Sequence, residues 1–157
     1  MMMEKEIISG MLGVSSVNTA LGIMCDEGNI ICSLAREAEA VDIDPEKAFL
    51  EYESVNRKNL QEHIVFCGNP VTFLKKKIEE EKQFDMVVVN TDRLEKSHDI
   101  WKLIGILAPS VVVLGYREQE KGEYNRQLMR TNGFQIMKQE IELNRHITEK
   151  FCVGMQQ

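Results

Sequence analysis

Apolar runs and stretches with a helical repeat alternate along most of this chain. Near-continuous apolar runs are typical of fully buried strands, and they lie at residues 19–25, 39–44, 63–67, 84–90 and 110–116. Amphipathic stretches predict helices at residues 27–38, 45–60, 69–82, 93–107 and 123–133. This alternation predicts right-handed crossovers and a parallel sheet with helices on both faces.

The carboxyl-terminal part of the chain breaks the alternation. Residues 133–143 and 146–155 predict two strands, and the polar residues Asn144 and Arg145 between them predict a short turn. Two strands joined in this way form an antiparallel hairpin. A length of 157 residues suits one domain with a single core. The pattern therefore predicts a single α/β domain over residues 1–157, with an open, mostly parallel sheet that ends in a hairpin.

The net charge of −6 limits the classes of partner. A phosphate backbone is bound through a basic face, so strong autonomous binding to nucleic acid is not expected. No apolar run reaches the roughly 18 residues of a membrane-spanning helix. The amino-terminal residues show no cationic stretch followed by a long apolar core, so no secretory signal is expected. We therefore expect a cytoplasmic protein that does not associate with membranes.

The cysteines predict neither a disulfide framework nor a metal site. The sequence holds four of them, widely spaced and outside any CxxC or Cys/His pattern: Cys25, Cys32, Cys67 and Cys152. We expect reduced, buried thiols, which behave as small apolar side chains.

Polar residues follow four of the predicted strands. In open α/β sheets, ligands bind at the carboxyl ends of the strands, near the point where the strand order switches. The polar tips are Asp26 to Asn29, Asp42 with Asp44, Asn69, and Asn90 to Arg93. Because the ends of parallel strands meet at one edge of a sheet, these four tips predict a ligand site.

Some of these tips also have purely structural explanations. Asp44 and Asn69 each precede a proline, as helix-capping residues do, and Gly28 is also explained by a tight turn. Asp42 is different, because it lies within the strand pattern and before the cap. A carboxylate there can accept hydrogen bonds from both hydroxyls of a ribose. Because a strand tip lies outside the core, we expect replacement of Asp42 to change stability little.

The segment "GIMCDEGNIICSLAREAEAVDIDPEKA", with "IVFCGN" and "FDMVVVNTDR" after it, resembles the core of class I S-adenosylmethionine-dependent methyltransferases. Within this class it is most similar to the catalytic domain of 5-methyluridine RNA methyltransferases, from about residue 19 to the carboxyl end. The resemblance implies a Rossmann-like methyltransferase sheet that binds S-adenosyl-L-methionine. The implied cofactor-binding residues are Cys25, Asp26, Glu27, Gly28, Asn29, Asp42, Ile43, Gly68, Asn69 and Asn90. The implied catalytic residues, which would hold the methyl acceptor, are Asn90, Asp92 and Arg93.

The sequence departs from the family pattern at three points. Asp26 replaces the first glycine of the cofactor turn, and Gly22 stands where the first strand usually carries an acid. The segment "VVVLGYREQE" lacks the nucleophilic cysteine that a 5-methyluridine enzyme needs after its fifth strand. The resemblance therefore leaves the acceptor open, with RNA and protein as candidates.

Two other functions compete with a methyltransferase. A non-catalytic module of the same fold would bind a partner protein, and either kind of protein could form a homodimer. A dinucleotide dehydrogenase also uses a ribose-binding acid, but it needs G-x-G-x-x-G after its first strand. The stretch "CDEGNIICS" holds only one glycine.

Replacing Asp26 by glycine should distinguish an enzyme from a non-catalytic module. At an effective dielectric constant near 20, two like charges about 4 Å apart cost about 4 kcal/mol. If Asp26 faces the cofactor carboxylate, the wild type binds cofactor poorly and Asp26→Gly restores affinity in calorimetry. If Asp26 contacts the cofactor ammonium, the wild type binds well and the same change weakens binding. Failure of both proteins to bind at millimolar cofactor would exclude the enzyme.

Overall fold

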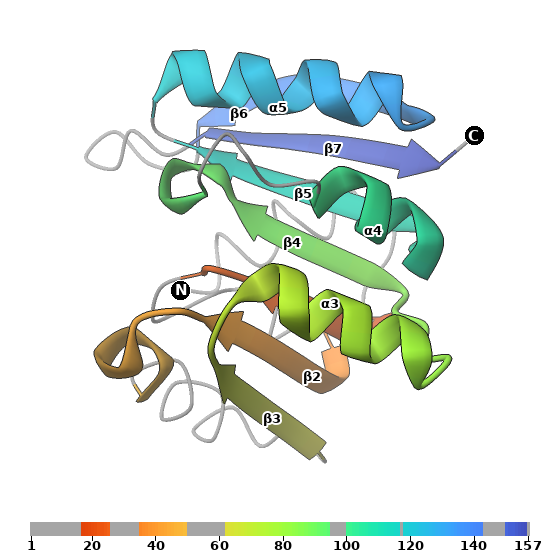
Figure 1. Cartoon of the computed structure of the whole chain (residues 1–157). Helices are drawn as coiled ribbons and strands as arrows, with labels where there is room; N and C mark the ends of the chain where they lie inside the picture. The colour runs from red at the N-terminus through yellow and green to blue at the C-terminus, as the bar shows by residue number, and fades with distance from the viewer. Residues whose placement is uncertain are drawn as a thin grey trace.

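A computed structural model describes residues 17–25, 35–49, 62–94, 100–116, 118–142 and 150–156. Their centre is one seven-stranded sheet with the order β3-β2-β1-β4-β5-β7-β6 (Figure 1). The strands are β1 (Val17–Ile23), β2 (Ala35–Asp42), β3 (Glu62–Cys67), β4 (Met86–Asn90), β5 (Val111–Tyr116), β6 (Phe134–Glu142) and β7 (Lys150–Gln156). The helices are α3 (Pro70–Glu79), α4 (Ile100–Leu107), α5 (Gln119–Thr131) and the short 3-10 helix η2 (Thr91–Arg93).

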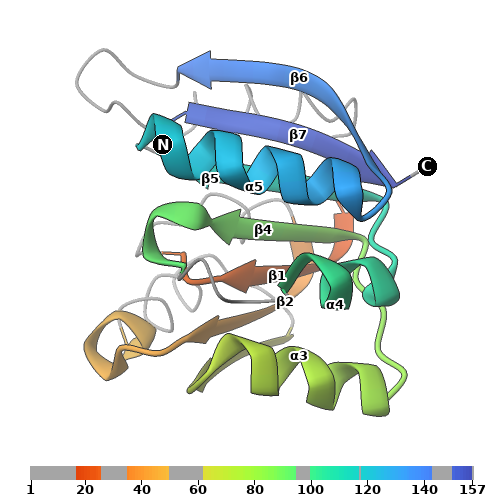
Figure 2. The same cartoon turned by 45° about the horizontal axis from the view of Figure 1, so that its top comes forward.

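The strand directions confirm the predicted sheet. Strands β1 to β5 pair in parallel, whereas β7 pairs antiparallel with both β5 and β6. Helices α3, α4 and α5 lie in front of the sheet in both views, so they cover the same face (Figures 1 and 2). The other predicted helices, apart from the helical residues 45–49, fall largely outside the described residues.

The predicted boundary between the first helix and the second strand is wrong. Residues 35–38 were expected at the end of a helix, but they form the first half of β2. Their parallel pairing with β1 begins at Val17 and Ala35. Arg36 and Glu37 are exposed, so the helix-like polar pattern there reflects a solvated strand end. Pairing between neighbouring strands has overridden local helical propensity.

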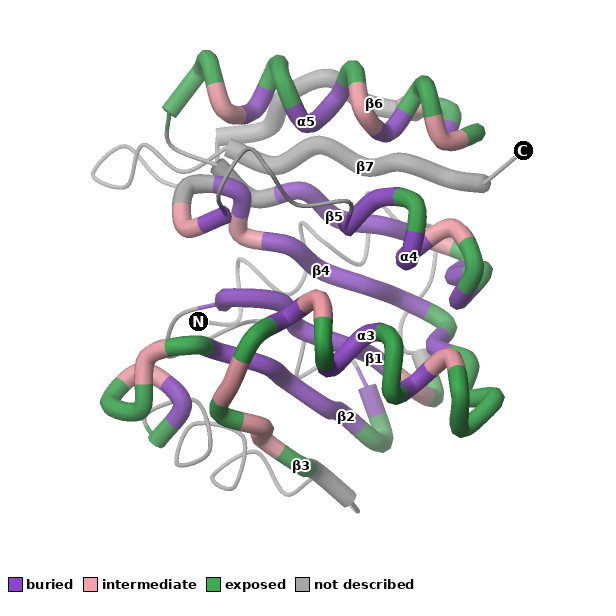
Figure 3. The backbone as a smooth tube through the Cα atoms, in the orientation of Figure 1, coloured by how far each residue is buried: buried purple, intermediate pink, exposed green. Residues whose placement is uncertain are grey.

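The core lies between the sheet and the helices α3 to α5. The inner strands β1, β2 and β4 are buried along most of their length (Figure 3). Trp101 of α4 is 1% exposed, and its ring packs edge-on against Phe134 with 6.2 Å between centroids. The Trp101 indole Nε1 donates a hydrogen bond of 2.8 Å to Oδ1 of the buried Asn125, which joins α4 to α5.

The strand order identifies where a ligand crevice should lie. The chain runs outward from β1 through β2 to β3, and then returns to the other side of β1 as β4. The order therefore switches between β1 and β4, where the following connections leave on opposite sides. The ends of β1, β2 and β4 accordingly surround the crevice in which an open α/β sheet binds its ligands.

No helix among the described residues is long and apolar enough to cross a membrane. Within the same residues, no cluster of three or more histidine, cysteine or acidic side chains could hold a metal ion. Two cysteines are described with their surroundings, and both are free thiols. Cys25 is buried as expected, but the expectation is wrong for Cys67, which is exposed because it ends β3 at the edge of the sheet.

A buried ion pair fixes β2 against α3. Lys77 Nζ lies 2.6 Å from Glu39 Oε1, and both side chains are about nine-tenths buried. The ammonium also lies 5.1 Å from the centroid of the Phe73 ring and 3.3 Å from Glu80 Oε2. Burial lowers the pKa of Lys77, but the hydrogen bonds and negative charges of Glu39 and Glu80 outweigh it, so this pKa lies above its usual value.

This raised pKa predicts a loss of stability at high pH. The ion pair contributes fully below the pKa of an unfolded lysine, about 10.4, and its contribution falls as the pH rises through the higher folded value. Lys77→Met should lower the free energy of unfolding by about 3 kcal/mol at pH 8, because it leaves Glu39 buried without its main counter-ion. The difference from wild type should then shrink towards pH 11 in urea titrations. The control is Lys76→Met, an exposed lysine of the same helix, and an equal pH slope in the two variants would contradict the assignment.

Candidate ligand site at the strand ends

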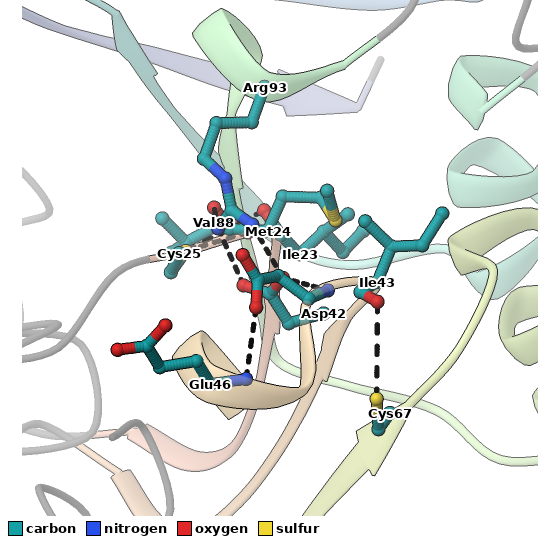
Figure 4. Close-up of polar contacts among 10 residues, drawn as sticks. Ile23, Met24, Cys25, Asp42, Ile43, Glu46, Cys67, Val88 and Arg93 are labelled. Carbon is teal, nitrogen blue, oxygen red and sulfur yellow. Dashed lines mark hydrogen bonds and ion pairs between the residues drawn. The ribbon is translucent and has the colours of Figure 1, made fainter. Parts of the chain in front are cut away.

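Asp42 is the last residue of β2 and is wholly buried, with 0% of its surface exposed. Its backbone carbonyl accepts a 2.9 Å hydrogen bond from the Gly68 amide, which ties the end of β2 to the end of β3. Its carboxylate Oδ1 accepts another of 2.9 Å from the Asp44 amide (Figure 4). A short polar turn thus aims the Asp42 side chain back over the end of the strand.

Asp44 has the capping role that its position before Pro45 predicts. Its Oδ1 accepts a 2.9 Å hydrogen bond from the Glu46 amide at the start of the helical residues 45–49. A cap of this kind satisfies an amide that has no partner within the helix. The two neighbouring carboxylates therefore differ in role, since Asp44 begins a helix and Asp42 points into the interior.

Arg93, the last residue of η2, binds the Asp42 carboxylate with both ends of its guanidinium (Figure 4). Nη1 donates to Oδ2 and Nη2 donates to Oδ1, each at 2.5 Å. Nη1 also donates a 3.0 Å hydrogen bond to the carbonyl oxygen of Met24, just beyond β1. One arginine therefore joins the ends of β2, β1 and β4, in the bidentate geometry that is strongest between guanidinium and carboxylate.

This pair corrects the expectation that replacing Asp42 would cost little stability. The expectation assumed that a strand tip lies outside the core, whereas Asp42 is fully buried and Arg93 has only 18% of its side chain exposed. A buried charge that loses its partner is strongly destabilising. Asp42 therefore contributes to the fold whatever else it binds.

The end of β1 turns sharply at Met24. Its φ of 59° lies in the left-handed region, which is uncommon for residues other than glycine. Its amide donates a 2.9 Å hydrogen bond to the Val41 carbonyl, and its side chain is buried. Such outliers cluster at binding sites, where the surrounding structure holds them in place. Sequence reasoning missed Met24, because a methionine carries no signal for this conformation.

Of the predicted cofactor turn, only Cys25 is described. It is buried, with Sγ 3.7 Å from the carbonyl oxygens of Ile23 and Val88, between β1 and β4. The other predicted turn residues, Asp26, Glu27, Gly28 and Asn29, lie outside the described residues.

The end of β3 supplies a cap and a close packing contact. Asn69 Oδ1 accepts hydrogen bonds from the amides of Val71 (2.8 Å) and Thr72 (3.3 Å), so Asn69 caps α3. A Cβ atom on Gly68 would lie 2.6 Å from Cε1 of Phe66, whose ring packs on Phe73 with 5.2 Å between centroids. A side chain at position 68 would therefore force the Phe66 ring to move.

Ile43 follows Asp42 and is 56% exposed, and Phe49 and Ile106 are exposed to a similar extent. The carbonyl of Ile43 lies 4.0 Å from the exposed thiol of Cys67, at the end of β3. An apolar surface therefore lies directly beside the buried carboxylate. Binding sites for rings with a polar edge combine these two features.

The predicted acceptor-binding residues occupy the end of β4. Asn90 is half-buried and ends the strand, one residue after the pairing of Val89 with Ile23 of β1. Asp92 lies in the middle of η2, after Thr91, which is buried, and before Arg93. Asn90 thus lies at the predicted switch point, whereas Arg93 reaches across it to Asp42.

No protein-family model matches the sequence, and no curated protein is significantly similar to it. Solved structures, however, match its backbone closely. Precorrin 8w decarboxylase from Methanobacterium thermoautotrophicum superposes with a TM-score of 0.70 and 13% identity, over 98% of this chain and 89% of that one. The chain has the Rossmann-like methyltransferase fold.

Two named methyltransferases give the same result. Magnesium protoporphyrin IX methyltransferase from Synechocystis, solved with bound S-adenosylmethionine, matches with a TM-score of 0.66 and 12% identity over 99% of this chain and 81% of that one. The N-methyltransferase NodS from Bradyrhizobium japonicum, solved with S-adenosylhomocysteine, matches with a TM-score of 0.66 and 14% identity, over 96% of this chain and 84% of that one. At these identities the methyltransferase fold is shared, and a fold alone does not fix an acceptor.

Removing the Asp42 carboxylate should destabilise this methyltransferase fold. Asp42→Ala leaves the Arg93 guanidinium without its main partner, so the free energy of unfolding should fall by about 2–3 kcal/mol. This is less than the roughly 3–5 kcal/mol of a fully buried pair, because Arg93 can turn towards water. Urea denaturation followed by circular dichroism measures the loss. Asp44→Ala is the matched control and should cost only about 1 kcal/mol, the value of a helix cap.

Proposed function

We propose that this protein binds S-adenosyl-L-methionine at the ends of β1, β2 and β4 and transfers its methyl group to an acceptor. The observation that carries the proposal is the wholly buried carboxylate of Asp42 beside the switch in strand order. A buried acid at the end of the second strand is the group that accepts ribose hydroxyls in nucleotide sites of this topology. The ligands named in the Synechocystis and Bradyrhizobium structures are of this class and support the choice of cofactor.

The described residues suit the chemistry of an adenosine ligand. Asp42 would accept from the ribose hydroxyls, and the exposed Ile43 would offer an apolar surface to the adenine ring. Gly68 and Asn69 would border the ring from the end of β3. The turn that begins at Cys25 would hold the methionine part.

The cofactor supplies the methyl group already activated on its sulfonium. The protein then has to exclude water and bring an acceptor atom into line with that methyl group. Asn90 would accept a hydrogen bond from an acceptor amine through its amide oxygen, and Asp92 and Arg93 would orient the acceptor from η2. A 5-methyluridine reaction is not part of the proposal, because the segment 111–120, which holds β5 and the residues directly after it, has no cysteine to add to the pyrimidine ring.

A second candidate function is a non-catalytic module that binds a partner protein. One observation favours it: both oxygens of Asp42 already bind Arg93 within the chain. The acidic residue Asp26 in the cofactor turn agrees with it. This alternative keeps the fold and the Asp42–Arg93 pair but assigns no cofactor to them.

Calorimetry with S-adenosylhomocysteine tests the proposal. The wild type should bind, and Asp42→Asn should weaken binding by about 10- to 100-fold, because hydrogen bonds to a charged acceptor are worth about 1.5–3 kcal/mol. Glu37→Gln makes the same carboxylate-to-amide change at an exposed position of β2 and should leave the affinity unchanged. If neither the folded wild type nor a folded variant without the Arg93 guanidinium binds at millimolar ligand, the cofactor assignment is wrong and the partner-binding module is preferred.

A further inference from the structure

We infer that Arg93 is a built-in competitor of the cofactor ribose, so that a ligand enters only when it displaces the guanidinium from Asp42. The inference rests on the proposed function, because it concerns regulation of the same site. It assigns Arg93 a role in addition to holding an acceptor.

The Arg93 guanidinium occupies acceptor positions on Asp42 that a ribose would need. A carboxylate offers about four acceptor positions on its two oxygens. Arg93 uses one on each oxygen, and the Asp44 amide uses a second position on Oδ1. A ribose that binds through two hydroxyls needs acceptor positions on the same carboxylate. The guanidinium and the sugar therefore compete for one group.

The two members of the pair differ in their exposure to solvent. Asp42 is 0% exposed, whereas the side chain of Arg93 is 18% exposed. The solvent-facing member of the pair is therefore the arginine, and the carboxylate lies behind it. Figure 4 shows the Arg93 side chain extending from η2 towards the Asp42 carboxylate. The arginine is therefore the member of the pair that a solute can contact without any rearrangement.

The Arg93 guanidinium can leave Asp42 by movement of its side chain alone. Arg93 ends a three-residue 3-10 helix, and its contacts with Asp42 and with the Met24 carbonyl are made at the tip of a long side chain. Rotation about the side-chain bonds can withdraw that tip without moving β4. The guanidinium stays charged at every accessible pH, so deprotonation cannot release it. At a pH where Asp42 is ionised, the guanidinium leaves by exchange of partners.

The same contacts would also suit a purely structural role, in which Arg93 is a rigid latch that holds three strand ends together and is not displaced by any ligand. Both roles predict that loss of Arg93 lowers stability, so stability cannot separate them. The two roles differ in the direction in which ligand affinity changes when Arg93 is replaced. A competitor, when removed, leaves the site more available, because apparent affinity falls in proportion to the fraction of molecules in the competent state. A latch, when removed, loosens the site and weakens binding.

The experiment is calorimetry of the folded full chain with S-adenosylhomocysteine, using Arg93→Met, Arg93→Lys and the control Arg36→Met. Arg36 is an exposed arginine of β2, and its replacement changes the net charge equally. Arg93→Met should bind at least about tenfold more tightly than wild type, as expected when the competent state is about 10% populated or less. The affinity of Arg93→Lys should lie between those of the wild type and Arg93→Met, because an ammonium cannot span both oxygens of Asp42. Arg36→Met should match wild type.

Adding Asp42→Asn to Arg93→Met should abolish the gain, because the gain depends on the freed carboxylate. If Arg93→Met does not fold, the tighter binding of Arg93→Lys carries the same test. Equal or weaker binding by the Arg93 variants, with a wild type that does bind, would overturn the competitor role and leave the proposed function intact. A gain that persists without the Asp42 carboxylate would also overturn it. If none of the proteins binds at millimolar ligand, both the competitor role and the cofactor assignment are wrong.

Discussion

A buried negative charge is the constraint on which this structure depends. The carboxylate of Asp42 is removed from water at the end of an inner strand, and an isolated ionised carboxylate in that position would be prohibitively unfavourable. Its compensation comes from Arg93 at the far side of the strand switch and from the Asp44 amide of its own turn. Because the arginine also binds the Met24 carbonyl, one charge fixes how three strand ends approach one another.

The sheet supplies the rigidity that this arrangement needs. Strand β1 lies between β2 and β4, with both neighbours parallel and in continuous register. The Glu39–Lys77 pair fixes β2 to α3 nearer the start of the strand. The side chain of Asp42 is thus held by elements on either side, as a binding group requires if it is to keep one orientation.

Sequence patterns predicted the fold well, because its inner strands are long apolar runs. Strands β4 and β5 match their predicted positions closely, and the predicted hairpin is present as β6 and β7. Strand β3 also has its predicted position, but the prediction that it is fully buried is wrong, because it lies at the edge of the sheet and Ile64 is 47% exposed. The start of β2 was missed, since Arg36 and Glu37 imitate a helix surface until pairing with β1 is known. Periodicity detects burial on a regular element, but it does not detect which strand a polar end will lie against.

The site was predictable only in part. Asp42 was recognisable because an acid interrupts a buried strand pattern, and Asn69 because asparagine before proline is a capping signal. The partner of Asp42 was not recognisable, because Arg93 is 51 residues away and only the strand order brings it near. Met24 gave no signal at all, since its backbone conformation is imposed by the hydrogen bond to Val41 and the packing around it.

The buried position of Trp101 gives the protein an intrinsic optical reporter. It is the single tryptophan of the chain, and its indole is enclosed between α4 and α5 with its N–H bound to Asn125. Emission from such a ring is blue-shifted and moves to longer wavelength when water reaches it. Tryptophan fluorescence would therefore report any separation of these two helices without an introduced label. It could be recorded while a ligand displaces Arg93 from Asp42.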